Sequence, residues 1–291
     1  MKLSPSDLHQ LADIAVRAAR EAGQMIAGSR PLDVQHKRGS DSLAAQVVTD
    51  IDRRSEGIIV DFLAPTLDRF DLGLLTEERH DDRSRLTTDH FWCVDPLDGT
   101  LPFIEGLPGY AVSIALVSRS GTPMIGVVYD PIEDVLLHAI SGAGVFIDRR
   151  SSSFDTEPRG EVLSVFADRS FHTRDDHDAV VDALEQIAHE LGLAGLRMQP
   201  AAGAVMNACG VLRNSPACYF KYPTRGGGGS SWDVAATACL FHEGGAVATD
   251  MFGGPLDLNR AGSNSMSHRG VLFASDELLA QRIRATNQTL S

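Results

Sequence analysis

The chain of 291 residues contains few cysteines and no long apolar run. Its four cysteines, Cys93, Cys209, Cys218 and Cys239, form no C-x-x-C pair, and their apolar neighbours favour buried free thiols over disulfides or metal ligands. No apolar stretch approaches the roughly 20 residues of a membrane-spanning helix. The N-terminus lacks a charged region followed by an apolar core, so it does not resemble a signal peptide. We therefore expect a cytoplasmic protein without a membrane partner.

Positive charge is also scarce, because 26 Lys and Arg residues stand against 39 Asp and Glu residues, a net charge of −13. Proteins that bind nucleic-acid polymers neutralise phosphates with Lys and Arg, so we expect no such partner. An acidic protein can still act on a small phosphorylated metabolite if bound cations reverse the local field. The sequence signatures of a nucleotide P-loop, a G-x-S-x-G nucleophile elbow and an H-E-x-x-H zinc site are all missing.

Two helices are predicted in the first 70 residues. Apolar residues recur with a helical period over residues 4–28, with Ser4 as N-cap, Pro5 at the first helical position and Asp7 completing a capping box. Polar residues 36–42 predict a loop. The pattern Thr49-x-x-Asp52 then predicts the start of a second helix.

The pattern changes to short β-rich runs between turn residues at 91–148, which predicts an antiparallel meander. The predicted strands are 91–94, 111–117, 125–129, 135–140 and 145–148. A polar stretch at 149–160 separates this region from strands 162–167 and 196–199, helices 175–191 and 203–212, a glycine loop at 226–229 and a helix starting near Ser231. We expect two lobes, residues 1–150 and residues 151–291, with layered α/β architecture.

Five acidic side chains lie in short segments that are far apart in the sequence: Asp52, Glu77, Asp95, Asp98 and Asp233. Two unit charges about 4 Å apart repel by roughly 4 kcal/mol at an effective dielectric constant of about 20. A cluster of these acids would therefore need cations or protons between its members. Carboxylate oxygens without thiolate or imidazole partners suit a hard cation, and Mg²⁺ first.

The segment Asp95-Pro96-Leu97-Asp98-Gly99-Thr100 is the most informative of these, because it directly follows a predicted strand. The proline stiffens the bend, Asp98 is able to face the same ion as Asp95, and the Leu97 carbonyl offers a further oxygen. Backbone N–H groups of Gly99 and Thr100 would suit a phosphate if a helix starts there.

Each segment also has a simpler structural explanation. Asp95 to Thr100 could form an ordinary turn, and Glu77 could belong to a solvated charged loop. Asp52 could be a capping-box acid, and Asp233 could complement a helix dipole. Taken singly, the last three are better explained in this way, and only the combination favours a shared cation site.

In order along the chain, the segments 48–52, 75–78, 92–100 and 232–236, with Glu243-Gly244-Gly245, resemble the inositol monophosphatase family over roughly residues 8–275. The resemblance implies a sugar-phosphatase fold with layers in the order α-β-α-β-α, an active site between the lobes, and a homodimer. It also implies hydrolysis of a small soluble phosphomonoester by metal-activated water. Alternatives are a 3'(2'),5'-bisphosphate nucleotidase, a histidinol-phosphate or fructose-1,6-bisphosphate phosphatase, and a non-catalytic magnesium-binding regulatory protein.

Carried over residue by residue, the resemblance implies two or three Mg²⁺ ions. Glu77, Asp95 and the Leu97 carbonyl would hold the first ion. Asp95, Asp98 and Asp233 would hold the second.

The resemblance also assigns roles in catalysis and phosphate binding. Glu77 and Thr100 would orient the attacking water. Asp52 would support Thr100 or hold a weaker third ion. Gly99 and Thr100 would contact the phosphate.

Three positions depart from the family pattern. Leu101-Pro102-Phe103 replaces residues that are usually polar, and Ala204 stands where a serine is common, so a substrate hydroxyl loses a partner there. The acid that often precedes the Trp-Asp pair is missing, and Lys221 and Arg225 flank the glycine loop instead. We expect these two cations to meet an additional anionic group of the substrate.

Overall fold

The computed structural model describes residues 2–29, 41–152, 160–224 and 228–290, with the backbone alone described for 41–49 and 287–290. Helix α1 (Pro5–Gly28) begins as predicted, because the Ser4 hydroxyl accepts a hydrogen bond from the Asp7 N–H and the Asp7 carboxylate accepts one from the Ser4 N–H. Its buried face is made of small and aliphatic residues, which lets it pack closely against its neighbours.

Helix α3 (Asp41–Phe70) corrects the predicted start of the second helix. The predicted loop at 36–42 lies outside the described residues except for its last two positions, which are helical. Residues 43–48 contain no glycine or proline and include strong helix formers, so the helix continues through Thr49. Asp52 therefore lies inside a helix and is not a capping-box acid.

The first sheet has seven described strands in sequential order. They are β1 (Leu72–Thr76), β2 (His90–Asp98), β3 (Ala111–Ser118), β4 (Pro123–Asp130), β5 (Val135–Ile140), β6 (Gly144–Ile147) and β7 (Arg150–Ser152). The predicted meander is confirmed from β2 to β6, where every pairing is antiparallel.

Two strands of this sheet, β1 and β7, were not predicted from the sequence. β7 forms from residues that were assigned to the polar boundary. β1 pairs with β2 in parallel, so the sheet is not purely antiparallel. Gly73 in β1 allows the backbone of Arg85 to approach, because a Cβ atom there would lie 2.8 Å from the Arg85 nitrogen.

The second sheet has five described strands in the order β11-β12-β10-β8-β9. The strands are β8 (Leu163–Phe166), β9 (Leu196–Met198), β10 (Ala217–Lys221), β11 (Val247–Thr249) and β12 (Val271–Ala274). The helices around it are α5 (His177–Glu190), α6 (Ala204–Arg213), α7 (Ala235–Gly244) and α8 (Glu277–Leu290). The short α4 (Thr100–Glu105) and the 3-10 helices η1 (Ser84–Leu86), η2 (Arg169–Thr173) and η3 (Ser231–Asp233) complete the described elements.

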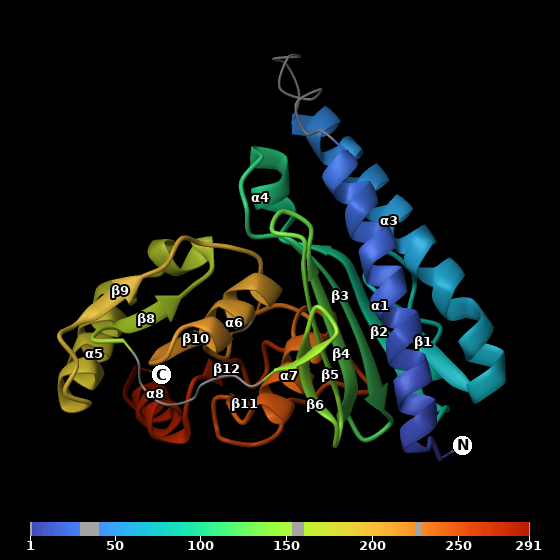
Figure 1. The fold of residues 1–291 in the computed structure, drawn as a ribbon. Helices are drawn as coiled ribbons and strands as arrows, with labels where there is room; N and C mark the ends of the chain where they lie inside the picture. The colour runs from blue at the N-terminus through green and yellow to red at the C-terminus, as the bar shows by residue number, and fades with distance from the viewer. Residues whose placement is uncertain (1, 30–40, 153–159, 225–227, 291) are drawn as a thin grey trace.

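The layers follow the predicted order α-β-α-β-α (Figure 1). One core lies between the helices α1 and α3 and the outer face of the first sheet. A second core joins both sheets through α6 and α7, and a third lies between the second sheet and the helices α5 and α8. All four cysteines are buried and unpaired, as predicted. Among the described residues, no helix is both long and apolar enough to pass through a membrane.

Candidate active site

Asp95 and Asp98 lie at the carboxyl end of β2, which continues through the segment that was predicted to follow it. Both side chains are buried. The pairing of β2 with β3 is irregular between them, and a bulge of this kind re-aims side chains, as is common beside active sites. Oδ1 of Asp95 accepts a hydrogen bond of 3.0 Å from the N–H of Leu97, which fixes the turn inside the segment.

Glu77 meets Asp95 because the strands β1 and β2 are parallel and end side by side. Glu77 follows β1 directly, its N–H donates to the Val94 carbonyl at 3.2 Å, and its carboxyl group interacts with that of Asp95. Burial, followed by repulsion from Glu77, Asp98 and Asp233, raises the pKa of Asp95 well above its usual range.

Asp98 is held by the N-terminus of α6 and interacts electrostatically with Asp95 and Asp233. Its Oδ1 accepts from the Ala204 N–H at 3.1 Å, and its Oδ2 accepts from the Val205 N–H at 2.9 Å. Burial and the charge of Asp233 raise the pKa of Asp98, while the Val205 N–H opposes them. Gly203 is required at this junction, since a Cβ atom there would lie 2.2 Å from Oδ2 of Asp98.

Asp233 reaches the site from η3, in the turn before α7. Its Oδ2 accepts a hydrogen bond of 2.9 Å from the Ser230 N–H in a capping box. Asp233 therefore has a structural role at the start of a helix and is also available to the acid cluster. The Ser113 hydroxyl donates to the Trp232 carbonyl at 3.2 Å, which fastens η3 to β3. Asp233 is thereby an electrostatic neighbour of Asp95 and Asp98.

Asp52 contributes a buried carboxyl group from α3. Its Oδ1 has no hydrogen bond within the described residues, and the same holds for Oε1 of Glu56 and Oγ1 of Thr76. Burial, followed by repulsion from Glu78 and Glu77, raises the pKa of Asp52 to about 7. These oxygens suit a cation or water better than an apolar interior.

Gly99 lies between β2 and α4, and Thr100 is the first residue of α4. The Thr100 hydroxyl donates to the Leu97 carbonyl at 3.5 Å, so this hydroxyl points to the segment itself and no hydrogen bond links it to Asp52. Gly99 has φ of 85°, and a Cβ atom there would lie 2.6 Å from the Gly109 carbonyl oxygen, so glycine is needed for the sharp turn.

Lys221 lies at the end of β10 and is a charged neighbour of Asp98 and Asp233. Its Nζ is 2.9 Å from Oδ2 of Asp168, and the charges of Asp168, Asp233 and Asp98 raise the pKa of Lys221 against the effect of burial. Arg225 lies outside the described residues. Asp168 was missed by the sequence analysis, although an acid just after the predicted strand 162–167 has the same placement as Asp95.

The donors available for a cation are carboxylate and carbonyl oxygens, which fit Mg²⁺ in chemistry. In the parts of the chain whose side chains are described, however, no three His, Cys, Asp or Glu side chains are arranged to hold one ion. The carboxyl group of Glu77 interacts with that of Asp95, and Asp98 accepts hydrogen bonds from α6. Thus the structure gathers the predicted acids without forming a ligand cage.

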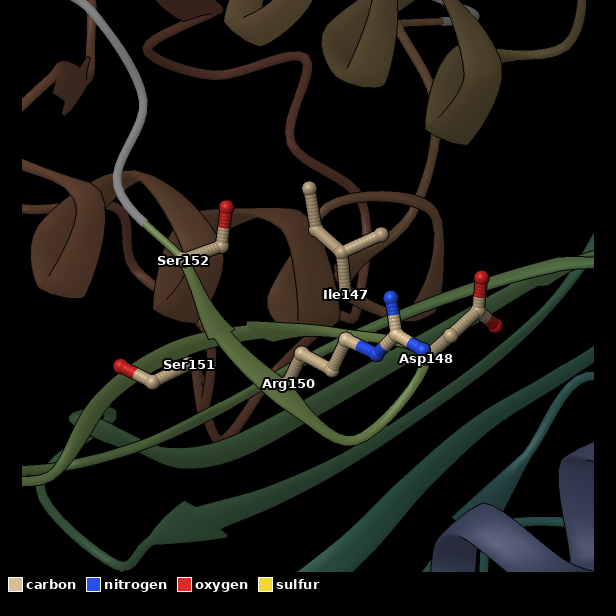
Figure 2. Close-up of a pocket in the computed structure, with 5 residues that line it drawn as sticks. All are labelled: Ile147, Asp148, Arg150, Ser151 and Ser152. Atoms are coloured by element: carbon tan, nitrogen blue, oxygen red, sulfur yellow. The ribbon is translucent and has the colours of Figure 1, made fainter.

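A separate groove of about 450 Å³ lies beside the β6–β7 hairpin and is lined by Ile147, Asp148, Arg150, Ser151 and Ser152 (Figure 2). It is at the opposite edge of the first sheet from β1 and β2. The Asp148 carboxylate is already bound to Arg20 at 2.8 Å. This groove is therefore distinct from the acid cluster.

Comparison with known proteins identifies the family of the chain. The model of the inositol monophosphatase family matches residues 7–289. Inositol monophosphatase 2 of Solanum lycopersicum is 29% identical over 86% of this chain and 91% of its own length, and Nus factor SuhB of Pasteurella multocida is 31% identical over 85% and 87%. The structure of inositol monophosphatase from Anabaena has the same fold, with a TM-score of 0.69, 24% identity and 97% of each chain covered. The chain therefore belongs to the inositol monophosphatase family.

Proposed function

We propose that this protein hydrolyses a small soluble phosphomonoester with water activated by Mg²⁺. The observation that carries the proposal is the meeting of Glu77, Asp95, Asp98 and Asp233 at one place, from β1, β2 and η3. Such a group of acids destabilises the fold unless cations or protons balance its charge. A cluster of this kind is expected at a site selected for binding cations. Membership of the family supports the same enzyme class, phosphoric monoester hydrolase.

The side chains of Glu77, Asp95, Asp98 and Asp233, with the carbonyl of Leu97, would hold the proposed ions. Bound Mg²⁺, two or three ions per site, would neutralise the phosphoryl oxygens and lower the pKa of a bound water.

The protein's own groups position that chemistry. Glu77 and Thr100 are proposed to orient the water, Asp52 to hold a weaker third ion, and the N–H groups of Gly99 and Thr100 to bind the phosphate. Ala204 lies at the site, but its N–H is held by Asp98 and its methyl group offers a substrate hydroxyl no hydrogen bond.

The proposal is tested by assaying phosphate release from a panel of inositol phosphates, adenosine 3',5'-bisphosphate, histidinol phosphate and fructose 1,6-bisphosphate. We expect turnover of at least one ester in Mg²⁺ and none in EDTA. The variant Asp95→Asn with Asp98→Asn should lose activity by at least about a hundredfold. The exposed Asp61, on α3, provides a control as Asp61→Asn. Full activity of the double variant would refute the proposal.

A second candidate function is regulatory, with the fold and the cation site kept but no turnover. The observation in its favour is that several similar proteins are named Nus factor SuhB, including that of Pasteurella multocida. Thermal stabilisation by Mg²⁺ without hydrolysis of any ester in the panel would favour this candidate. A homodimer and a cytoplasmic location remain proposals from the family resemblance, to be measured by light scattering and by cell fractionation.

A further inference from the structure

A hollow of about 340 Å³ lies next to the acid cluster, on the side of the second sheet. Its lining includes the polar or charged side chains of Asp168, Ser170, Arg174, Lys221 and Thr224. Its volume is in the lower range of small-molecule pockets. The lining contains two cations and one carboxylate, in a chain whose net charge is −13.

Lys221 stands where the hollow meets the acid cluster. A Cβ atom placed on Gly229 would lie 3.2 Å from Nζ of Lys221 and 2.6 Å from Oδ2 of Asp233, so both groups flank the same glycine. Asp168 holds the ammonium group, and it is itself fixed by the Tyr219 hydroxyl at 2.9 Å and the Asn207 amide at 3.2 Å. The position of this cation is therefore set by a hydrogen-bonded network that includes the buried Asn207 and Tyr219.

Arg174 provides the second cation of the lining. Its guanidinium carbon lies 5.2 Å from the ring centroid of Tyr222, and its Nε and Nη2 donate to Asp176 at 2.7 and 2.6 Å. These contacts hold the guanidinium plane, while 31% of the side chain stays exposed. Its Nη1 group makes no hydrogen bond to the residues that the structure describes, which leaves a donor for a ligand.

We propose that this hollow binds a second phosphate group, carried by the alcohol part of the substrate, through Arg174 and Lys221. The substrate class would then be a phosphomonoester that bears a further phosphate, with one phosphate at the acid cluster and the other at Arg174. A charge-assisted hydrogen bond to a fixed guanidinium is among the stronger polar contacts and is selective for phosphate geometry. This inference rests on the proposed function, because it names the substrate class of the same site.

The first test compares two esters that differ only in the distal phosphate, adenosine 2',5'-bisphosphate and adenosine 2'-monophosphate. We expect the wild type to prefer the bisphosphate in kcat/KM. Arg174→Gln should lower kcat/KM for the bisphosphate by about tenfold or more and change the monophosphate less than about twofold. Arg174→Lys should retain part of the preference. No preference in the wild type, or equal losses on both esters, would overturn the inference.

The matched control is Arg282→Gln. Arg282 is a half-exposed arginine of the same half of the chain, paired with Glu190 at 2.9 Å, and it does not line the hollow. We expect its removal to leave both values of kcat/KM unchanged. Thermal unfolding of all variants verifies that any loss comes from binding rather than from folding.

A second readout separates this inference from the proposed function. Adenosine 5'-monophosphate, which keeps only the distal phosphate, is titrated calorimetrically in EDTA into the protein carrying Asp95→Asn and Asp98→Asn. Adding Arg174→Gln should weaken binding about tenfold, whereas adding Arg282→Gln should not. Arg174-dependent binding without hydrolysis of any ester would refute the proposed function alone. Hydrolysis with binding that is insensitive to Arg174 would refute the second phosphate site alone.

Discussion

Asp98 and Val205 are 107 positions apart, and the Val205 N–H donates a hydrogen bond of 2.9 Å to Oδ2 of Asp98. This bond fastens the end of β2, in the first sheet, to the first turn of α6, in the helical layer between the sheets. The orientation of a proposed metal ligand is therefore set by a helix that belongs to the other half of the chain.

The first prediction concerns Gly203, which allows this contact. In Gly203→Ala the new methyl carbon would lie 2.2 Å from Oδ2 of Asp98 and 2.7 Å from the backbone of Gly99, so Asp98 must move. A displacement of about 1 Å at a catalytic site costs on the order of a hundredfold in rate, and we expect a loss of that size in kcat/KM.

Gly57, inside α3, is the control for this variant, because a Cβ atom there has no neighbour within 4 Å. Gly57→Ala should raise stability by about 0.5 to 1 kcal/mol and leave the rate unchanged. A Gly203→Ala enzyme with the wild-type rate would show that the Asp98 contact does not position the site.

The second prediction concerns Asp52 in the metal-free protein. Burial raises the pKa of Asp52 to about 7, above its value in the unfolded chain. The ionised carboxylate therefore lowers the free energy of unfolding above pH 7, and this destabilisation disappears as the pH falls from 7 toward 4. Asp52→Asn should stabilise the protein at pH 8 in EDTA by at most about 4 kcal/mol, and the gain should vanish near pH 4.

Urea unfolding at both pH values measures this gain, with Asp61→Asn on the exposed face of α3 as control. An identical gain at pH 8 and pH 4 would mean that Asp52 is not the titrating group.

The third prediction concerns His138, which is 8% exposed and stacks on Phe146 with ring centroids 4.8 Å apart. Burial lowers its pKa to about 4, so the unfolded chain takes up the proton first as the pH falls. The folded state should lose about 2 kcal/mol of stability from this group between pH 7 and pH 5.

His138→Gln should remove that part of the pH dependence. The measurement is the difference in unfolding free energy between pH 7 and pH 5 for the wild type and the variant. Equal differences would contradict the prediction.

The fourth prediction concerns Arg85, whose side chain is 3% exposed. Its guanidinium donates to Asp81 at 2.9 Å, to the Asn259 amide oxygen at 2.7 Å and to the Arg260 carbonyl at 3.0 Å. Arg85→Met leaves these acceptors without a donor, so we expect a loss of about 2 to 4 kcal/mol in urea unfolding.

The half-exposed Arg282 is the comparison for Arg85, and Arg282→Met should cost less than about 1 kcal/mol. Similar costs for both variants would show that burial does not strengthen the Arg85 contacts.

Several elements were predictable because their signals are local. The caps of α1 come from residues within one helical turn, and the strands β2 to β6 are β-rich runs between turn residues. The acids at 95 and 98 were identifiable because carboxylates after a strand, with proline and glycine between and behind them, indicate a specific bend. These features depend little on the rest of the fold.

Other features depend on contacts that are distant in sequence. The strand β1 is short, contains Gly73 and is stabilised by its parallel neighbour β2. Asp168 gains its importance from Asn207, Tyr219 and Lys221, which no local pattern connects to it. A Thr-x-x-Asp pattern misled the prediction for α3, because the same pattern is compatible with a helix interior when helix formers precede it.

The central core has a consequence for how the chain acquires its structure. Side chains of the first sheet, of α6 and α7, and of the second sheet pack into one apolar cluster. If the chain were cut near residue 150, each fragment would expose a large apolar face to water. Synthesis of the N-terminal half alone therefore leaves an aggregation-prone intermediate, and Asp233 joins Glu77, Asp95 and Asp98 only after the C-terminal half has folded.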